Sequence, residues 1–201
     1  DVSPQKKPSV PHKTEHSQLP QFLASVNISN HLNGCITLEP EKLCRIELSK
    51  EAINFSAAHF TIFSRTERED LHGHNFQVIG EALAPVDLNG LVFDYAVLKK
   101  ALKQLCDDLD EKTILPEKSP YLSIEKDSQY VSGIFDNQKL MFLHRDVITL
   151  PIANVSVEEL SHYFLKKLME LPEIKNKDIR EVVIKISSSP GQAGTAIWRT
   201  S

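Results

Sequence analysis

Residues 71–79 read LHGHNFQVI, and in this stretch His72, His74, Phe76 and Val78 occupy every second position. A repeat of two residues is typical of a β-strand, in which alternate side chains point to the same face. Two histidines spaced this way have Cα atoms about 6.5 to 7 Å apart, so their imidazoles can reach one metal ion. The stretch therefore predicts a strand that carries a pair of potential metal ligands.

Alternating apolar residues mark further strands, and helical spacing separates them. The repeat of two recurs at 44–49, 53–59, 182–187 and 195–198, and the strand that begins at 72 continues to about residue 84. Helical spacing follows Asp94, a candidate N-cap, and a second helix opens with a capping box formed by Ser156 and Glu159. This order predicts an α+β fold, an antiparallel sheet with helices on one face.

The segment 112–153 is an insertion between the two predicted helices. Within it, residues 130–135 and 139–143 flank Asp136 and Asn137, which favour a hairpin turn. Residues 91–93 (LVF) predict a short buried strand, or an approach segment, ahead of the first helix.

Composition excludes several classes of protein. The 201 residues carry a net charge of −4, so there is no basic excess for nucleic acid. No apolar run approaches the roughly 18 residues of a membrane span. Three widely spaced cysteines suggest neither a disulfide framework nor a metal knuckle and fit a reducing cytoplasm. Four prolines in the first 20 residues predict a disordered tail, with a lead-in to residue 42 and one domain over 43–201.

A third histidine, His59, ends the strand predicted at 53–59. If this strand pairs antiparallel with the next one, His59 lies beside His72 and His74. Three neutral histidines leave one tetrahedral position of zinc open, which is the arrangement of catalytic zinc sites. The alternative is that His59 is a hydrogen-bonded core residue and that the other two lie on the surface. The occurrence of both motifs on consecutive strands favours the metal site.

Four segments resemble the 6-pyruvoyl-tetrahydropterin synthase and 6-carboxy-tetrahydropterin synthase family. They are FSAAHF (55–60), LHGHNF (71–76), GLVFD (90–94) and Leu109-Asp110. The resemblance covers roughly residues 44–199 and implies the tunnelling fold, a four-stranded antiparallel sheet with two helices. It also implies homo-oligomers, usually trimers stacked into hexamers, and Zn²⁺ bound by His59, His72 and His74. The implied substrate is a small pterin, 7,8-dihydroneopterin triphosphate.

The chain departs from the family pattern at the catalytic base. The usual base is a cysteine ahead of His-Gly-His, but residues 61–71 (TIFSRTEREDL) contain no cysteine. One branch of the family has a glutamate there and cuts the pterin side chain to give 6-hydroxymethyl-dihydropterin, a folate precursor. Resemblance to that branch implies that Glu69 is the base. The alternative is that Glu67, Glu69 and Asp70 form a solvated charged loop.

The family also uses a Leu-Asp-His sequence, which here reads Leu109-Asp110-Glu111. Asp110 remains a candidate catalytic residue, although the Asp–His pair is lost. The alternative is that Asp110 belongs to the acidic end of a helix, where such charges oppose the helix dipole. His144 and His162 are candidate substitutes for the missing histidine.

Substrate binding shows a third departure. The family anchors the amino-pyrimidine edge of the pterin with a glutamate, and Ser188 lies nearest to that position. A carboxylate accepts two hydrogen bonds from such an edge, whereas a serine does not match it in this way. Gln192 could reach the ring instead, and Ser156 matches a residue that lines the pterin pocket, although its role as a helix cap is sufficient by itself.

These features support three functions. The first is a zinc-dependent lyase acting on the side chain of 7,8-dihydroneopterin triphosphate. The second is an enzyme of the same scaffold acting on another heterocycle, and the third is a zinc-binding relative without catalysis.

Overall fold

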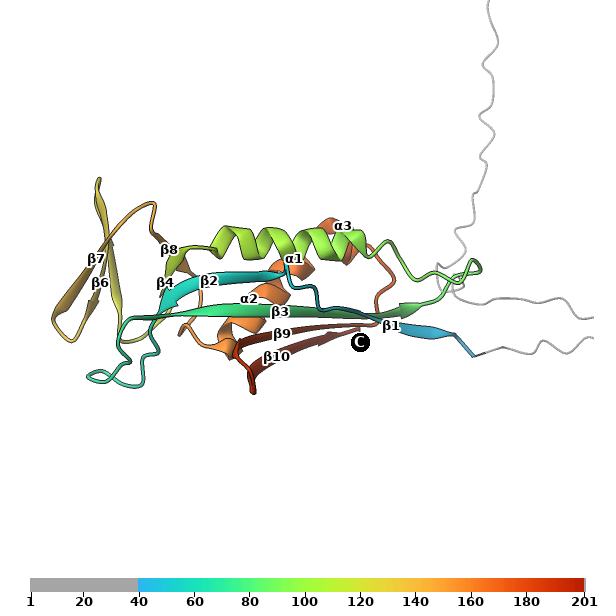
Figure 1. Ribbon diagram of the computed structural model, residues 1–201, viewed down its shortest axis with the longest axis horizontal. Helices are drawn as coiled ribbons and strands as arrows, with labels where there is room; N and C mark the ends of the chain where they lie inside the picture. The colour runs from blue at the N-terminus through green and yellow to red at the C-terminus, as the bar shows by residue number, and fades with distance from the viewer. Residues whose placement is uncertain (1–39, 201) are drawn as a thin grey trace, which may run out of the picture. The chain divides into compact units, whose positions relative to one another are not determined.

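The computed structural model describes residues 40–200, so the predicted tail and most of the lead-in lie outside the described residues. Figure 1 shows the arrangement of its strands and helices. The strands are β1 (Leu43–Leu48), β2 (Asn54–His59), β3 (His72–Pro85), β4 (Lys112–Pro116), β5 (Ser123–Lys126), β6 (Tyr130–Phe135), β7 (Gln138–Leu143), β8 (Val147–Leu150), β9 (Glu181–Ser189) and β10 (Gln192–Arg199). The helices are α1 (Ala96–Leu109), α2 (Val157–Glu170) and α3 (Pro172–Lys175).

The main sheet has the order β10-β9-β3-β2-β4-β8, and β1 pairs with β3 beyond the end of β2. The 14-residue strand β3 is long enough to pair with β2 along its first half and with β1 along its second half. The α+β class is confirmed, but the sheet is larger than the four antiparallel strands expected. The added strands β4 and β8 pair in parallel at the two ends of the insertion. Each has only four or five residues without strict alternation, so its pattern gave no strand signal.

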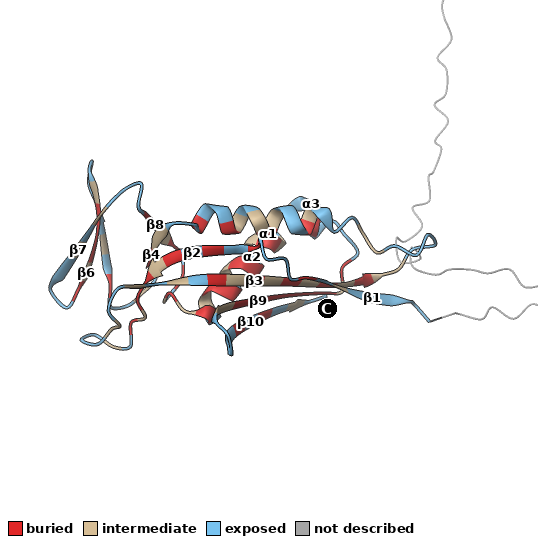
Figure 2. Ribbon diagram, in the orientation of Figure 1, coloured by how far each residue is buried: buried red, intermediate tan, exposed pale blue. Residues whose placement is uncertain are grey.

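Helices α1 and α2 bury their apolar sides against one continuous core (Figure 2). Phe55 of β2 stacks on Phe76 of β3 at 4.9 Å between ring centroids and on Phe164 of α2 at 5.8 Å. On β10, a Cβ at Gly194 would lie 2.5 Å from the backbone of Val157. Glycine is required there because the first turn of α2 lies directly on the strand.

Two local predictions need correction and one is confirmed. Helix α1 begins at Ala96 with Tyr95 at its N-cap, although the Asp94 carboxylate accepts a hydrogen bond from the Ala96 amide. Residues 91–93 form no strand and are exposed or half-buried, because they lie in a loop that has no partner strand. The predicted cap of α2 is confirmed, since the Ser156 hydroxyl accepts a hydrogen bond from the Glu159 amide.

The insertion folds into a second sheet of three strands, in the order β5-β6-β7. Asp136 and Asn137 have φ of 45° and 61°, the left-handed conformations that a two-residue hairpin turn requires, so the predicted hairpin is confirmed. This sheet has a small core of its own, made of Phe60, Ile62, Leu115, Leu122, Val131, Phe135 and Val147. Within residues 40–200, no helix has the length and apolar character that crossing a membrane would demand.

Candidate metal centre

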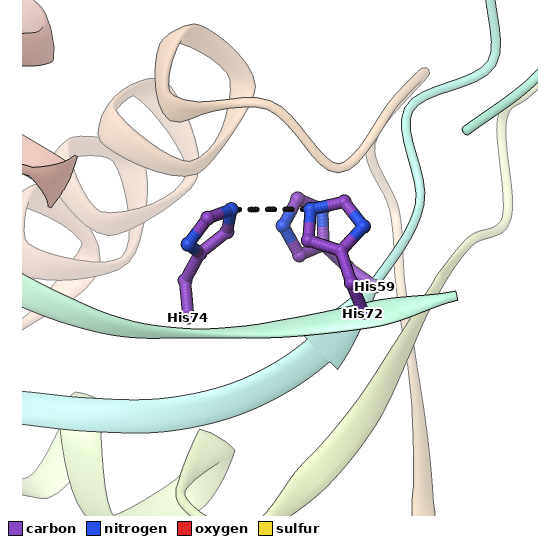
Figure 3. A group of neighbouring side chains, drawn as sticks. All are labelled: His59, His72 and His74. Atoms are coloured by element: carbon purple, nitrogen blue, oxygen red, sulfur yellow. Dashed lines mark hydrogen bonds between the residues drawn. The ribbon is translucent and has the colours of Figure 1, made fainter. Parts of the chain in front are cut away.

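The three predicted histidines come together at one end of the main core (Figure 3). His59 is paired directly with His72 across β2 and β3, and His74 lies two residues further along. All three side chains lie on the helix-covered face, in the same row as Phe76. One ring nitrogen from each histidine lies within 4.8 Å of the others.

Backbone carbonyls orient two of these rings. His59 Nδ1 lies 3.0 Å from the Val155 carbonyl oxygen, and His72 Nδ1 lies 2.8 Å from that of Asp70. A carbonyl only accepts, so each Nδ1 carries the hydrogen and each Nε2 presents a lone pair. Metal-bound histidines are usually oriented in this way, by a hydrogen bond from the nitrogen that does not touch the metal.

One of these nitrogens has no protein partner, and the other two have only each other. His59 Nε2 is buried without a hydrogen bond, and the Nε2 atoms of His72 and His74 lie 3.1 Å apart. A buried nitrogen without a partner is costly unless another group binds it. The three nitrogens can therefore hold a divalent cation such as zinc, and three ligands leave one tetrahedral position open.

Burial keeps His59 neutral. Its side chain is 5% exposed, and desolvation, followed by the charges of His72 and His74, lowers the pKa of His59 to about 4. A neutral imidazole is the form that binds metal, so proton competition at this ligand is weak at neutral pH.

Glu69 lies on a short hairpin that connects β2 to β3. The Glu69 amide donates to the Thr61 carbonyl at 2.9 Å, the Thr61 amide donates to Glu69 Oε2 at 2.9 Å, and Ile62 bridges to Arg68. Burial alone would raise the pKa of the Glu69 carboxyl. Hydrogen bonds from Thr61 and the nearby charges of His72 and His59 outweigh burial, so the net pKa of Glu69 is lowered. The carboxylate is therefore ionised beside the histidines.

Asn154 is a structural contributor that the sequence analysis missed. Its side-chain oxygen accepts from the Ile62 amide at 3.0 Å, and its side-chain nitrogen donates to the Ile62 carbonyl at 2.8 Å. Val155, the next residue, holds His59 through its carbonyl. The segment before α2 thus fixes both the hairpin of Glu69 and one histidine. An asparagine in a loop gives no sequence signal of such a long-range contact.

Asp110 lies just past the end of α1, where its carboxylate accepts a hydrogen bond from the Ser56 amide at 2.7 Å. The next residue, Glu111, has a φ of 57°, and its amide donates to the Ser56 carbonyl. Glu111 lines an open hollow of about 720 Å³ together with His74 and Ser188. The hollow therefore brings one predicted binding residue, Ser188, to the same place as one predicted metal ligand.

The remaining candidates lie elsewhere. Gln192 lines a separate hollow over β3, β9 and β10. Ser156 caps α2 directly after Val155. His144 bonds to the Asp127 carbonyl beside the three-stranded sheet, and His162 is exposed on α2. Neither histidine belongs to the group formed by His59, His72 and His74.

Comparisons with known proteins point to one family. Residues 47–196 match the family described as 6-pyruvoyl tetrahydropterin synthase. A putative 6-carboxy-5,6,7,8-tetrahydropterin synthase of Methanocaldococcus jannaschii is 28% identical over 145 residues, which cover 70% of this chain and 86% of that protein.

Solved structures show the same similarity. The 6-pyruvoyl tetrahydropterin synthase of Plasmodium vivax is 30% identical with a TM-score of 0.74, and the match covers 80% of this chain and 100% of that one. The 6-pyruvoyl tetrahydropterin synthase of Plasmodium falciparum is 32% identical with a TM-score of 0.73, and the match covers 79% of this chain and 99% of that one. Two further P. vivax structures, with cysteine or alanine in place of a glutamate, are described as mutants of a catalytic residue. The expected tunnelling fold is confirmed, and the chain belongs to the 6-pyruvoyl tetrahydropterin synthase family.

Proposed function

We propose that the protein is a zinc-dependent lyase that acts on the side chain of 7,8-dihydroneopterin triphosphate. The observation that carries this proposal is the convergence of three histidine nitrogens beside an ionised glutamate. Neutral nitrogens can hold a Lewis acid, and a neighbouring carboxylate can accept a proton, so the two halves of the required chemistry lie side by side.

His59, His72 and His74 would hold the zinc ion, which when bound polarises the hydroxyl oxygens of the substrate side chain. The Val155 and Asp70 carbonyls keep two of the three ligands in the required tautomer. Aromatic packing of Phe76 against His59 and His74 restricts the ring positions further.

Glu69 is the proposed general base, which accepts a proton from the substrate side chain. Its lowered pKa keeps it deprotonated at neutral pH, and the Thr61 amide fixes one carboxylate oxygen and leaves the other for the substrate. The catalytic glutamate of the P. vivax enzyme, which is 30% identical to this chain, supports the assignment. With glutamate as base, the expected product is 6-hydroxymethyl-dihydropterin rather than the 6-pyruvoyl compound.

The hollow beside His74 is the proposed binding place for the pterin ring. Ser188 and the backbone around it offer hydrogen-bonding groups, and Glu111 adds a carboxylate to the lining of the same hollow. We place Ser156 near the substrate and Asp110 as a secondary proton acceptor, although the observed bond to the Ser56 amide also gives Asp110 a structural role.

The proposed function also includes an oligomeric state and a cellular compartment. Strand β10 lies at one edge of the sheet, so pairing with another copy would satisfy the backbone groups of that edge. A trimer or hexamer in the cytoplasm is the expected form, and the free thiols of Cys44 and Cys106 agree with a reducing compartment.

The test is incubation of the zinc-loaded protein with 7,8-dihydroneopterin triphosphate, with product identification by liquid chromatography and mass spectrometry. We expect 6-hydroxymethyl-dihydropterin, and a loss of kcat on the order of 100-fold or more in Glu69→Gln. The matched control is Glu67→Gln, which changes an exposed carboxylate on the same hairpin. Absence of turnover, or equal kcat values for Glu69→Gln and the wild type, would contradict the proposal.

A second candidate is the same chemistry on a different heterocycle. The neutral hydroxyls of Ser188 and Ser189 in the hollow favour it, because they do not match a two-donor edge as a carboxylate does. Equilibrium binding of a panel of pterins and purines decides between the two. Tightest binding by a heterocycle without an amino-pyrimidine edge would favour the second candidate.

A further inference from the structure

The hairpin that carries Glu69 rests on the three-stranded sheet of the insertion. Phe60 and Ile62, which flank Thr61, are almost fully buried in the small core of that sheet. Phe135, from the end of β6, is 3% exposed in the same core. The insertion therefore packs against the segment that carries the proposed base.

Arg68 links the insertion to Glu69. Its guanidinium carbon lies 4.9 Å from the centroid of the Phe60 ring and 5.7 Å from that of Phe135, which is the geometry of cation–π contacts. Its Nη1 donates a hydrogen bond of 2.6 Å to the carbonyl oxygen of Glu69. The Phe60 and Phe135 rings thus fix the Arg68 guanidinium, which in turn fixes the carbonyl group of Glu69.

This linkage leads to an inference that rests on the proposed role of Glu69. We propose that Phe135 is a positioning residue, which acts through Arg68 to keep the Glu69 carboxylate at the distance and angle that proton transfer requires. Small displacements of a catalytic group reduce the rate steeply, because proton transfer needs near hydrogen-bond contact. The three-stranded sheet, which contributes no residue to the histidine group, would then contribute directly to turnover.

The shape of the hairpin supports a positioning role. Its tip is closed by the Phe63 and Ser64 amides, which both donate to the Glu67 carbonyl, while Asn154 clamps Ile62 from the other side. The amide and the carboxylate of Glu69 are bonded to Thr61, whereas its carbonyl oxygen is bonded to the Arg68 guanidinium. Loss of the Phe135 ring would loosen that last contact and leave the others in place.

The test compares Phe135→Leu with Phe135→Tyr in the full chain. Leucine retains apolar volume but removes the ring face, and tyrosine restores the ring. With 7,8-dihydroneopterin triphosphate, we expect kcat to fall about 10-fold in Phe135→Leu with KM within about 2-fold, and to recover in Phe135→Tyr. The matched control is Phe142→Leu, which alters another phenylalanine packed against the same core from β7.

Amide hydrogen exchange supplies a readout that needs no turnover. We expect the Glu69 and Thr61 amides to exchange about 10-fold faster in Phe135→Leu than in Phe142→Leu, while bound zinc stays the same. Equal exchange and equal kcat in the two leucine variants would overturn the positioning role. Faster exchange in Phe135→Leu without any turnover by the wild type would instead refute the proposed reaction and leave the structural linkage in place.

Discussion

The histidine group and the Glu69 hairpin lie side by side but are built in different ways. The histidines come from two paired strands of the main sheet, whose register brings them together, and backbone carbonyls orient two of the rings. Glu69 comes from a connecting hairpin that is held by Asn154, Arg68 and the inserted sheet. The proposed metal ligands therefore depend mainly on the pairing of β2 with β3, whereas the proposed base depends on a loop held by Asn154 and the inserted sheet.

The largest expected effect is at Gly194, where the two regions share a support. A Cβ there would lie 2.5 Å from the Val157 backbone, so Gly194→Ala must push α2 and the adjoining Val155 away from β10. We expect a loss of roughly 3 kcal/mol or more in the free energy of unfolding, together with weaker metal binding, because His59 loses its carbonyl partner.

Chemical denaturation and a zinc titration measure the two effects. The matched control is Gly73→Ala, since a Cβ at Gly73 meets nothing closer than 3.6 Å. Equal unfolding free energies for the two alanine variants would show that the first turn of α2 can shift without cost.

The next effect is a pH dependence of the free energy of unfolding, which we expect from the histidine group. The pKa of His59 is about 4 in the folded protein and about 6.5 in an unfolded chain, so the unfolded state binds more protons between these values. The free energy of unfolding of the metal-free protein should therefore fall as the pH is lowered from about 6.5 to 4. The loss should reach roughly 3 kcal/mol at most.

Urea unfolding of the metal-free protein at a series of pH values measures this dependence. His59→Leu removes the titrating group and should flatten the curve over that window. A wild-type curve that is equally flat would contradict the burial of a neutral His59.

A smaller effect is expected at Asn154, which holds the hairpin but no histidine. Asn154→Ala removes both hydrogen bonds to Ile62 and should lower the free energy of unfolding by about 1 to 2 kcal/mol. Asn154 also accepts a hydrogen bond from the Val155 amide at 3.1 Å, but it bonds to none of the three histidines, so metal stoichiometry should remain unchanged while kcat falls. The control is Asn89→Ala in an exposed loop, for which all three quantities should match the wild type. Loss of metal in Asn154→Ala would show that Asn154 supports the histidine group as well as the hairpin.

The positions of the histidine group and of the start of α2 could be predicted from sequence. The repeat of two around His72 and His74 specified their common face, and the capping box at Ser156 specified the start of α2. Local patterns of this kind report on neighbours within an element. They contain no information on the Asn154 contact with Ile62 or on the stacking of Arg68 between rings that are 75 residues apart in sequence. The parallel pairing of β4 with β2 was missed for the same reason.

The zinc site is tested most directly by the zinc content of the purified full chain after dialysis, measured by inductively coupled plasma mass spectrometry. We expect about one zinc per chain in the wild type and in the surface variant His162→Ala, and less than about one tenth of that in His74→Ala. Wild-type protein without bound metal, or equal zinc in His74→Ala, would contradict the binding of one ion by these three imidazoles.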